Sequence, residues 1–342
     1  MKRTVYLLLA LLPISLFLVF NYFTISHTTE TSFYYWKTVF ELNNSEKSYL
    51  KQLNVKSLNV RFFDVDWDDN LKTTYPLGVI NNLNPIANIE IIPTIFITNK
   101  TLYHIKESQI PNFCKNVTNK IFSIYDSSKI KQIQFDCDWT ERTKGTYFSF
   151  LNEFKQNFPN LNFSVTIRLH QIKFKDKTGV PPVKSGMLMV YNLDKIGDAN
   201  THNSILDLKS FEMYIAKLSE YPLKLDIALP IFSQGVLLRN TKAMYLIQNI
   251  NKSDLENTNE FKKIDNVHFK SINNHYFYGN YIYKNDIIRY ENVGLAILKQ
   301  VAQKLKNRIK NKNLKITYFH LDSINISKIK YNEIQDINNN FH

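Results

Sequence analysis

The feature that most constrains this chain is a regular alternation of short β-branched or aromatic runs with longer helical segments, which starts near residue 32. Such alternation is typical of parallel strands joined by crossover helices. Strand segments are expected at residues 32–39, 57–66, 89–98, 130–138, 162–170, 186–192, 223–232 and 314–322. Helices are expected at residues 45–53, 109–125, 146–157, 205–220 and 288–309. The pattern predicts an α/β fold, a (β/α)8 barrel of the TIM type.

An open doubly wound sheet is the alternative fold, but no Gly-rich phosphate-binding loop follows any of the strand segments. Residues 240–287 are too many for an ordinary connection and fall between the seventh and eighth strands, which predicts an insertion at the rim. The rest of residues 31–342 is expected to form one barrel domain. Inside the insertion, aromatic residues flank Gly279 and Asn280, which predicts a hairpin. Its rings either pack the insertion onto the barrel or lie over the barrel mouth.

Residues 1–30 have a different character from the rest of the chain. A basic start, Lys2 and Arg3, precedes an uninterrupted apolar stretch. This is the pattern of a secretory signal peptide or of an N-terminal membrane anchor. No small-residue cleavage motif is evident before Asn21. We therefore expect an exported protein, periplasmic or otherwise extracytoplasmic, that is either released or held at the membrane by residues 4–23.

The charge and cysteine content exclude several classes of protein. The formal net charge is +13, but lysines are spread along the chain, so no nucleic-acid partner is expected. The densest basic run, residues 304–313, is interpreted as the solvated end of a helix, with a polyanion site as the alternative. Cys114 and Cys137 have no metal-ligand spacing and form no disulfide framework. No cofactor and no metal site are expected.

Polar and apolar side chains alternate in the fourth and fifth strand segments. The polar sets are Gln134, Asp136 and Asp138 in the fourth segment, and Ser164, Thr166, Arg168 and His170 in the fifth. Alternate side chains of a strand point to opposite faces, so the polar sets are expected to face the barrel interior. Interiors of such barrels are normally apolar and active sites lie at the carboxyl ends of the strands, so these charges predict a functional site.

Other strand segments contribute further polar residues to the expected site. They are Asp64, Asp66, Tyr191, Asn192, Asp226, Tyr318 and His320. Each of these residues alone is more often a capped strand end or a structural ion pair, but several together predict a binding or catalytic site. Arg168 is expected to keep one carboxylate ionised, while crowding between Asp136 and Asp138 raises the pKa of the other. Such a separation of acid and base is what glycosidic-bond cleavage requires.

The fourth segment, "IQFDCDWT", resembles the D-x-x-D-x-D-x-E strand of family 18 glycoside hydrolases, and "MVYN" at residues 189–192 resembles their M-x-Y-D. By position, Asp136 and Asp138 match the second and third aspartates, and Tyr191 matches the tyrosine. Residues 33–323 are also similar to an uncharacterised family of bacterial exported proteins with glycosidase-type barrels, on the acidic fourth segment and the "TIRLHQ" of the fifth. The resemblance implies a glycan or polysaccharide partner.

The chain departs from the glycosidase motif at three positions. Ile133 replaces the first aspartate, Thr140 replaces the proton-donating glutamate, and Asn192 replaces an aspartate. A threonine cannot protonate a leaving oxygen. Glu141 stands one residue later and would reach the site only if a turn re-aimed it.

Two functional hypotheses from different classes follow, with a third behind them. The first is a glycosidase-like barrel that acts on a glycan by a modified mechanism, with Asp136, Asp138 and Glu141 as the catalytic candidates. Its expected substrate-binding residues are Asp64, Asp66, Arg168, His170, Tyr191, Asn192, Asp226, Tyr318 and His320. The second is a non-catalytic envelope protein that binds glycans or serves as a scaffold. Metal-dependent hydrolysis through the aspartates and a histidine ranks third, because no diagnostic spacing supports it.

Overall fold

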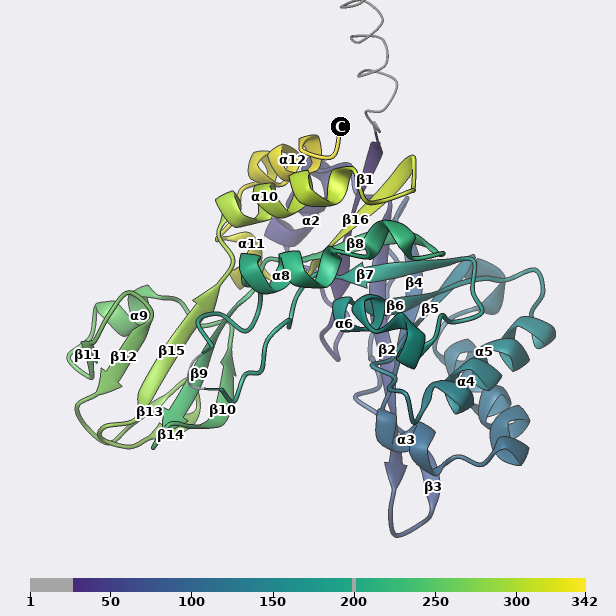
Figure 1. Ribbon diagram of the computed structural model, residues 1–342, viewed down its shortest axis with the longest axis horizontal. Helices are drawn as coiled ribbons and strands as arrows, with labels where there is room; N and C mark the ends of the chain where they lie inside the picture. Colours follow the sequence, from purple (N-terminus) through teal and green to yellow (C-terminus); the bar gives the residue numbers. More distant parts are fainter. Residues whose placement is uncertain (1–26, 199–200) are drawn as a thin grey trace, which may run out of the picture.

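The chain folds around a closed barrel of eight parallel strands (Figure 1). The computed structural model describes residues 27–198 and 201–342. The barrel strands are β1 (Thr28–Tyr35), β2 (Ser57–Asp68), β4 (Glu90–Ile97), β5 (Gln132–Asp136), β6 (Asn162–Arg168), β7 (Ser185–Met189), β8 (Lys224–Pro230) and β16 (Asn313–Phe319). Pairing of β1 with both β16 and β2 closes the ring. The predicted (β/α)8 fold is confirmed.

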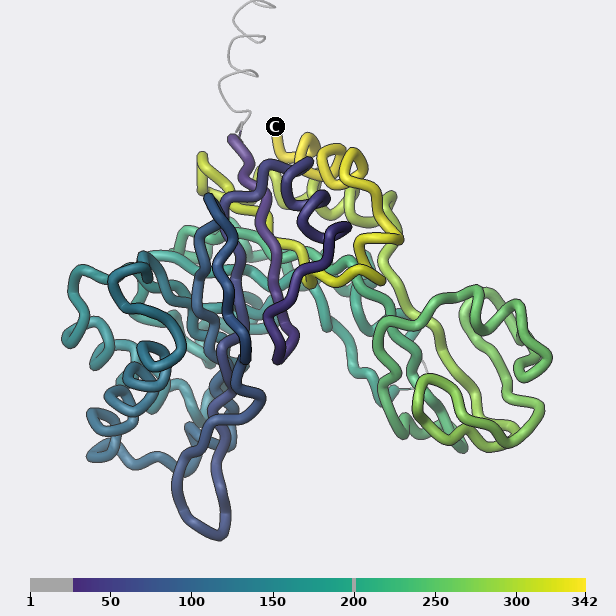
Figure 2. Tube along the Cα trace, turned by 180° about the vertical axis from the view of Figure 1, so that it is seen from behind, coloured from purple at the N-terminus to yellow at the C-terminus, as the bar shows by residue number. Residues whose placement is uncertain are grey.

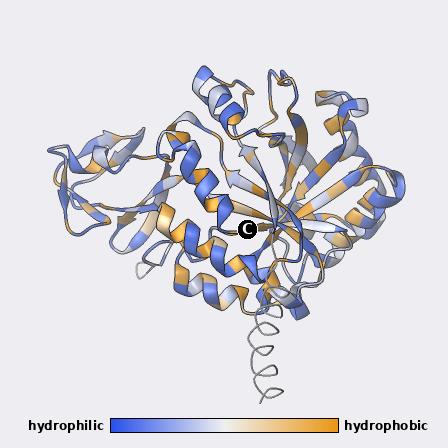
Figure 3. Cartoon of the chain, turned by 90° about the horizontal axis from the view of Figure 1, so that it is seen from above, coloured by the Kyte–Doolittle hydropathy of each residue, from blue (hydrophilic) through white to orange (hydrophobic). Residues whose placement is uncertain are grey.

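Helices of varied length connect the barrel strands and pack around them. They are α2 (Asn44–Gln52), α3 (Asn99–His104), α4 (Ile110–Ile124), α5 (Lys144–Asn157), α6 (Leu169–Lys173), α7 (Lys175–Thr178), α8 (Leu208–Ile215), α10 (Leu295–Lys306), α11 (Ser323–Ile326) and α12 (Tyr331–Asn339). Seen from above in Figure 3, these helices carry both hydrophilic and hydrophobic segments, as expected for elements that bury one face.

Local sequence signals set the bounds of the longer helices. Asn43 and Glu46 form a reciprocal capping box at the start of α2. Pro111 stands in the first turn of α4, where its missing N–H costs no hydrogen bond. Phe113, Val117 and Ile121 then recur every four residues and are all buried in the barrel's core. This spacing directs one face of α4 onto the barrel.

The second barrel strand is unusually long and continues into a hairpin with β3 (Thr73–Leu77). Figures 1 and 2 show this hairpin projecting beyond the barrel. The pairing of β2 with β4 shifts register between Arg61 and Phe63. The irregularity resets the alternation of side chains, so that Arg61 and Asp64, three residues apart, lie on one face and pair.

The insertion between the seventh and eighth barrel strands folds as an antiparallel sheet beside the barrel (Figure 3). Its strands are β9 (Ser233–Arg239), β10 (Lys242–Gln248), β11 (Phe261–Lys263), β12 (His268–Ser271) and β15 (Ile287–Asn292), with the short helix α9 (Ser253–Glu256). It encloses a core of its own, which includes Leu237, Phe269 and Ile288. The insertion sheet thus extends from Ser233 to Asn292, wider than residues 240–287.

The expected hairpin around Gly279 is present as β13 (His275–Phe277) and β14 (Asn280–Ile282). Figure 1 places this hairpin at the end of the insertion away from the barrel, so the hairpin does not lie over the barrel mouth. The helix expected at residues 288–309 is wrong in its first part. Residues 287–292 form β15, where alternating side chains fit a two-sided sheet, and the helix begins only after Gly294.

A fully buried ion pair joins the insertion to the barrel's connections. Arg289 Nε lies 2.8 Å from Glu291, and neither side chain is exposed. The Arg289 guanidinium also donates to the carbonyl oxygens of Ile196 and Asp198, in the connection that follows β7. Ser204 and Gln234 donate to the other oxygen of Glu291. Complete hydrogen bonding is what makes a buried ion pair tolerable.

Replacing Arg289 with methionine is expected to lower the free energy of unfolding by about 3–5 kcal/mol, because it strands Glu291 as a buried charge. Urea denaturation followed by tryptophan fluorescence and circular dichroism measures the change. The matched control is Lys262→Met on the exposed edge strand β11, which should shift stability by less than about 0.5 kcal/mol. A change below about 1 kcal/mol for Arg289→Met would contradict the view that Arg289 compensates the buried charge of Glu291.

None of the helices in residues 27–198 and 201–342 is long and apolar enough to cross a membrane. The expected signal or anchor, residues 4–23, lies outside the described residues.

Candidate functional site

Asp136 is the last residue of β5 and points into the barrel interior. It is 4% exposed, and Thr166 Oγ1 of the neighbouring strand β6 donates to it at 2.6 Å. Burial raises the pKa of Asp136 to about 6, and the negative charge of Asp138 adds to the rise, while Arg168 opposes it. Asp136 therefore gains a proton far more readily than an ordinary aspartate.

Asp138 follows two residues later, beyond the end of the strand, and its side chain is 41% exposed. Arg168 Nε donates to one carboxylate oxygen at 2.5 Å and Arg168 Nη2 to the other at 3.3 Å. Burial alone would lower the pKa of Arg168, but the carboxylates of Asp138 and Asp136 outweigh it and hold the pKa above its usual range. Asp138 is the exposed partner of a fixed arginine, and Asp136 is the buried one.

Backbone contacts hold Arg168 in place. Its N–H donates to Gln171 Oε1 at 2.7 Å, and Gln171 Nε2 donates to the carbonyl of Trp139 at 3.0 Å. Trp139 is itself buried, stacked on Tyr147 and hydrogen-bonded to the carbonyl of Thr178. The segment after β5 and the start of α6 therefore form one rigid unit around the ion pair.

A row of aromatic rings continues from Arg168 across the carboxyl ends of the strands. The Arg168 guanidinium lies 5.6 Å from the Tyr191 ring centre, and Tyr191 lies 5.1 Å from Phe319. Phe319 then lies 5.6 Å from Trp36, which follows β1. Phe232, after β8, packs on both Tyr191 and Phe319. Trp36, Phe232 and Phe319 remain partly exposed.

The far end of the row repeats the charged arrangement of the near end. The guanidinium of Arg61 lies 5.8 Å from the Trp36 ring. Arg61 also pairs with Asp64 through two hydrogen bonds, one of 2.7 Å. We call the set Arg61, Asp64, Trp36, Phe319, Tyr191, Arg168 and Asp138 the mouth row. Its carboxylate–arginine pairs flank aromatic rings, an arrangement able to hold a polar ligand that has flat apolar faces.

Thr140 begins a tight turn and contributes no acid to the mouth row. Its N–H donates to Thr143 Oγ1 at 2.9 Å, and its carbonyl accepts from Lys144 in the first turn of α5. Glu141 lies exposed on this turn. The candidate proton donor is therefore in solvent next to the mouth, whereas Asp136 and Asp138 are held in it.

The structure separates several other expected site residues from the mouth row. Asp66 accepts from Thr98, the cap of α3, and Asp226 lies near the amino end of β8, bonded to Asn311 and the N–H of Lys315. Tyr318 faces the outer helices and donates to Asn338. His320 lies behind Phe319, where burial lowers its pKa.

Two further expected residues lie close to the mouth but point to solvent. The strand β6 ends at Arg168, so His170 falls on α6 and is exposed instead of continuing the inward-facing set. Asn192 takes a left-handed backbone conformation, φ +56°, directly after Tyr191, and is exposed.

Sequence reasoning missed Trp36, Arg61, Phe232 and Phe319. The available signal was an aromatic residue at or just after the carboxyl end of three strands, in "YYW", "PIF" and "YFH". Within residues 27–198 and 201–342, no group of three or more His, Cys, Asp and Glu side chains is arranged to hold a metal ion. The aspartates of the third hypothesis are instead divided among separate partners: Asp64 with Arg61, Asp66 with Thr98, and Asp138 with Arg168.

The fold is a (β/α)8 barrel, and solved structures with this fold, several of them glycosidases by name, resemble it. The Bacillus megaterium spore cortex-lytic enzyme SleL aligns with a TM-score of 0.56 at 15% identity, over 93% of this chain and 75% of that one. The C-terminal domain of a putative chitinase from Desulfitobacterium hafniense aligns with a TM-score of 0.58 at 8% identity, over 93% and 100%.

The GH18 chitinase ChiB of Flavobacterium johnsoniae aligns with a TM-score of 0.50 at 10% identity, over 92% of this chain and 94% of that one. No family model and no curated protein matches the sequence. The likeness in fold to family 18 barrels, expected from the fourth and sixth strands, is confirmed; at these identities it speaks for the fold alone.

The raised pKa of Asp136 makes stability depend on pH in a direction opposite to that of most carboxylates. A folded-state pKa near 6 means that the native chain binds the proton more tightly than the unfolded chain. Protonated Asp136 therefore adds to the free energy of unfolding. This stabilisation, roughly 2–3 kcal/mol, is fully present below about pH 4 and is lost as the pH rises through 6. The Asp136→Asn variant, which keeps an acceptor for Thr166, should lack this loss.

Urea unfolding of the wild type and of Asp136→Asn between pH 4 and 7.5 measures the difference, and the variant should gain relative stability as pH rises. Carbon NMR of the aspartate carboxyl groups checks the titration directly. A midpoint for Asp136 at or below 4 would contradict the account.

Proposed function

We propose that this protein binds a glycan at the mouth row and does not hydrolyse it. The observation that carries the proposal is the continuous arrangement of Arg168, Tyr191, Phe319 and Trp36 at the carboxyl ends of the barrel strands. A pyranose ring offers apolar C–H faces for stacking on aromatic rings and equatorial hydroxyls for carboxylates. The exposed carboxylate of Asp138 is the hydrogen-bond acceptor of this site.

The geometry at Thr140 favours binding over turnover. Hydrolysis needs an acid within hydrogen-bond reach of the leaving oxygen. Glu141 is in solvent, and Asp136, the group with the raised pKa, is almost wholly enclosed behind Asp138. The similar structures include chitinases and a spore cortex-lytic enzyme, so amino-sugar polymers are the first ligand class to test.

Trp36→Ala is expected to weaken binding of an N-acetylglucosamine oligomer by about tenfold or more, because it removes a partly exposed stacking surface from the mouth row. Isothermal titration calorimetry with chitotetraose and with soluble peptidoglycan fragments measures the affinity. Tyr276→Ala, an equally drastic truncation of an exposed ring on β13, is the control and should bind as the wild type does. Equal affinity of Trp36→Ala and wild type would reject the mouth row as the binding surface.

A second candidate function, slow hydrolysis, is favoured by one observation. Asp136 and Asp138 are neighbouring carboxyls in different surroundings, and burial raises the pKa of Asp136; acid and base catalysis uses pairs of this kind. We expect the wild type to release no reducing ends above a heat-inactivated control from chitin oligomers or peptidoglycan. The contrary result would be release of reducing ends by the wild type, together with an Asp138→Asn variant that still binds the glycan but releases none. That result would replace the binding proposal with catalysis.

The location of the protein belongs to the same proposal. Residues 1–30 are interpreted as a signal or anchor for export, which would place the barrel outside the cytoplasm, where envelope glycans are found.

A further inference from the structure

The two ends of the barrel carry opposite charge. One end is formed by the connections that precede each barrel strand after the first, residues 53–56, 78–89, 125–131, 158–161, 179–184, 216–223 and 307–312. They hold eight basic and two acidic residues, net +6. The connections that follow strands, residues 36–43, 69–72, 98, 137–143, 190–198, 201–207, 231–232 and 320–322, hold four basic and eight acidic residues, net −4. We call the first set the basic face; it lies opposite the mouth row.

The most strongly basic connection surrounds the point at which the N-terminal segment joins the barrel. Thr28 N–H donates to the carbonyl of Lys312 at 2.8 Å. The ring of His27, buried, contacts the carbonyls of Asn311 and Lys306. Figures 1 and 2 both place the start of β1 beside the C-terminus, and His342 contacts Thr29. The run at residues 304–313 therefore contacts the start of β1 at residues 27 and 28, which the apolar N-terminal stretch precedes.

Much of this charge is available to a partner. Arg308, Lys310, Lys312, Lys129 and Lys131 are all exposed. Of the two acidic residues in these connections, Glu220 pairs with Lys175, and Asp126 accepts from Ser128 at the start of a short helical turn. The connections therefore keep most of their positive charge, and an anionic surface is its natural complement.

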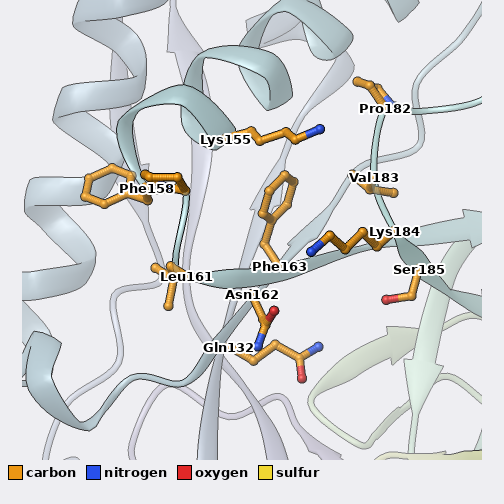
Figure 4. A pocket seen from close by; sticks show the side chains of 11 residues that line it. Gln132, Lys155, Phe158, Leu161, Asn162, Phe163, Pro182, Val183, Lys184 and Ser185 are labelled. Atoms are coloured by element: carbon orange, nitrogen blue, oxygen red, sulfur yellow. The ribbon is translucent and has the colours of Figure 1, made fainter.

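The basic face is also hollowed at the amino ends of β5, β6 and β7 (Figure 4). A pocket of about 300 Å³ lies there, with the side chains of Lys155 and Lys184 on either side of the Phe163 ring. Asn162 and Gln132 add polar groups at its floor. A recess with two amines and an apolar ring suits an anionic headgroup that carries part of its apolar chain.

We propose that the basic face docks on a bilayer that contains anionic phospholipid. The length and apolar character of the 26 residues before His27, and their attachment beside the most basic of these connections, argue for a membrane as the occupant. A single apolar segment leaves the barrel free to tilt relative to the membrane surface. Positive charge on one end of the barrel favours the orientation in which that end faces anionic lipid. Docked in this way, the barrel presents the mouth row away from the membrane, and this holds whether the mouth row binds or cleaves its ligand.

The test is partition of the full chain onto phosphatidylcholine vesicles with and without phosphatidylglycerol. The triple variant Lys129→Gln, Lys131→Gln, Lys312→Gln removes three exposed charges of the basic face. The control triple, Lys242→Gln, Lys262→Gln, Lys284→Gln, removes three exposed charges from the insertion. The apolar segment contributes to binding of both lipids, so only the gain from phosphatidylglycerol is compared.

The face triple should lose about 100-fold of that gain, since each lysine near an anionic surface adds about a factor of five, and the control should lose little. Equal loss by both triples, or no gain from phosphatidylglycerol in the wild type, overturns the proposal. Retention on an acidic polysaccharide without any gain on the vesicles also overturns it, in favour of a polymer partner.

An orientation measurement gives a second, independent readout. Both native cysteines are buried, so a polarity-sensitive dye reacts with an introduced Ser127→Cys on the basic face or Ser253→Cys on α9. The emission of the Ser127→Cys label should shift to the blue on phosphatidylglycerol vesicles, and the Ser253→Cys label should not. The reverse pattern, or equal shifts, would contradict the docking geometry.

Discussion

The ion pair between Asp138 and Arg168 organises this end of the molecule. It joins the segment after β5 to the end of β6, and its charges act on the neighbouring side chains at the barrel mouth. Arg168 limits the rise in the pKa of Asp136 and also lies over the ring of Tyr191. Without the guanidinium, two carboxylates would crowd one barrel mouth, and the aromatic row would lose its link to the acidic strand.

The same ion pair supports the proposal that this barrel binds a glycan without cleaving it. In this chain Arg168 holds the partly exposed carboxylate of Asp138, while Asp136, whose pKa is raised, is buried. The turn at Thr140 uses its polar groups for the start of α5. Under the proposal, a site fixed in this manner would orient a ligand, while the enclosed Asp136 would not reach its leaving oxygen.

The sequence predicts the barrel well because its signals are local. Strands such as residues 57–66 and 162–170 alternate in hydrophobicity, and the polar alternation correctly directs Gln134, Asp136 and Thr166 inward. The errors arise where the alternation stops or is shifted. Helix α6 starts immediately after Arg168 and carries His170 outward, and the register of β16 turns Tyr318 to the outer helices. Residues 287–292 look helical in isolation but pair with a strand fifty residues earlier, a contact no local pattern encodes.

The central claim is that a glycan lies intact along the mouth row. A crystal structure of the protein soaked with chitotetraose tests it most directly, because it reports both the place and the integrity of the ligand. The account predicts an uncleaved oligosaccharide with one ring stacked on Trp36 or Phe319 and a hydroxyl or amide group bonded to Asp138. A cleaved saccharide in the mouth, or a ligand bound only to the insertion, would contradict it.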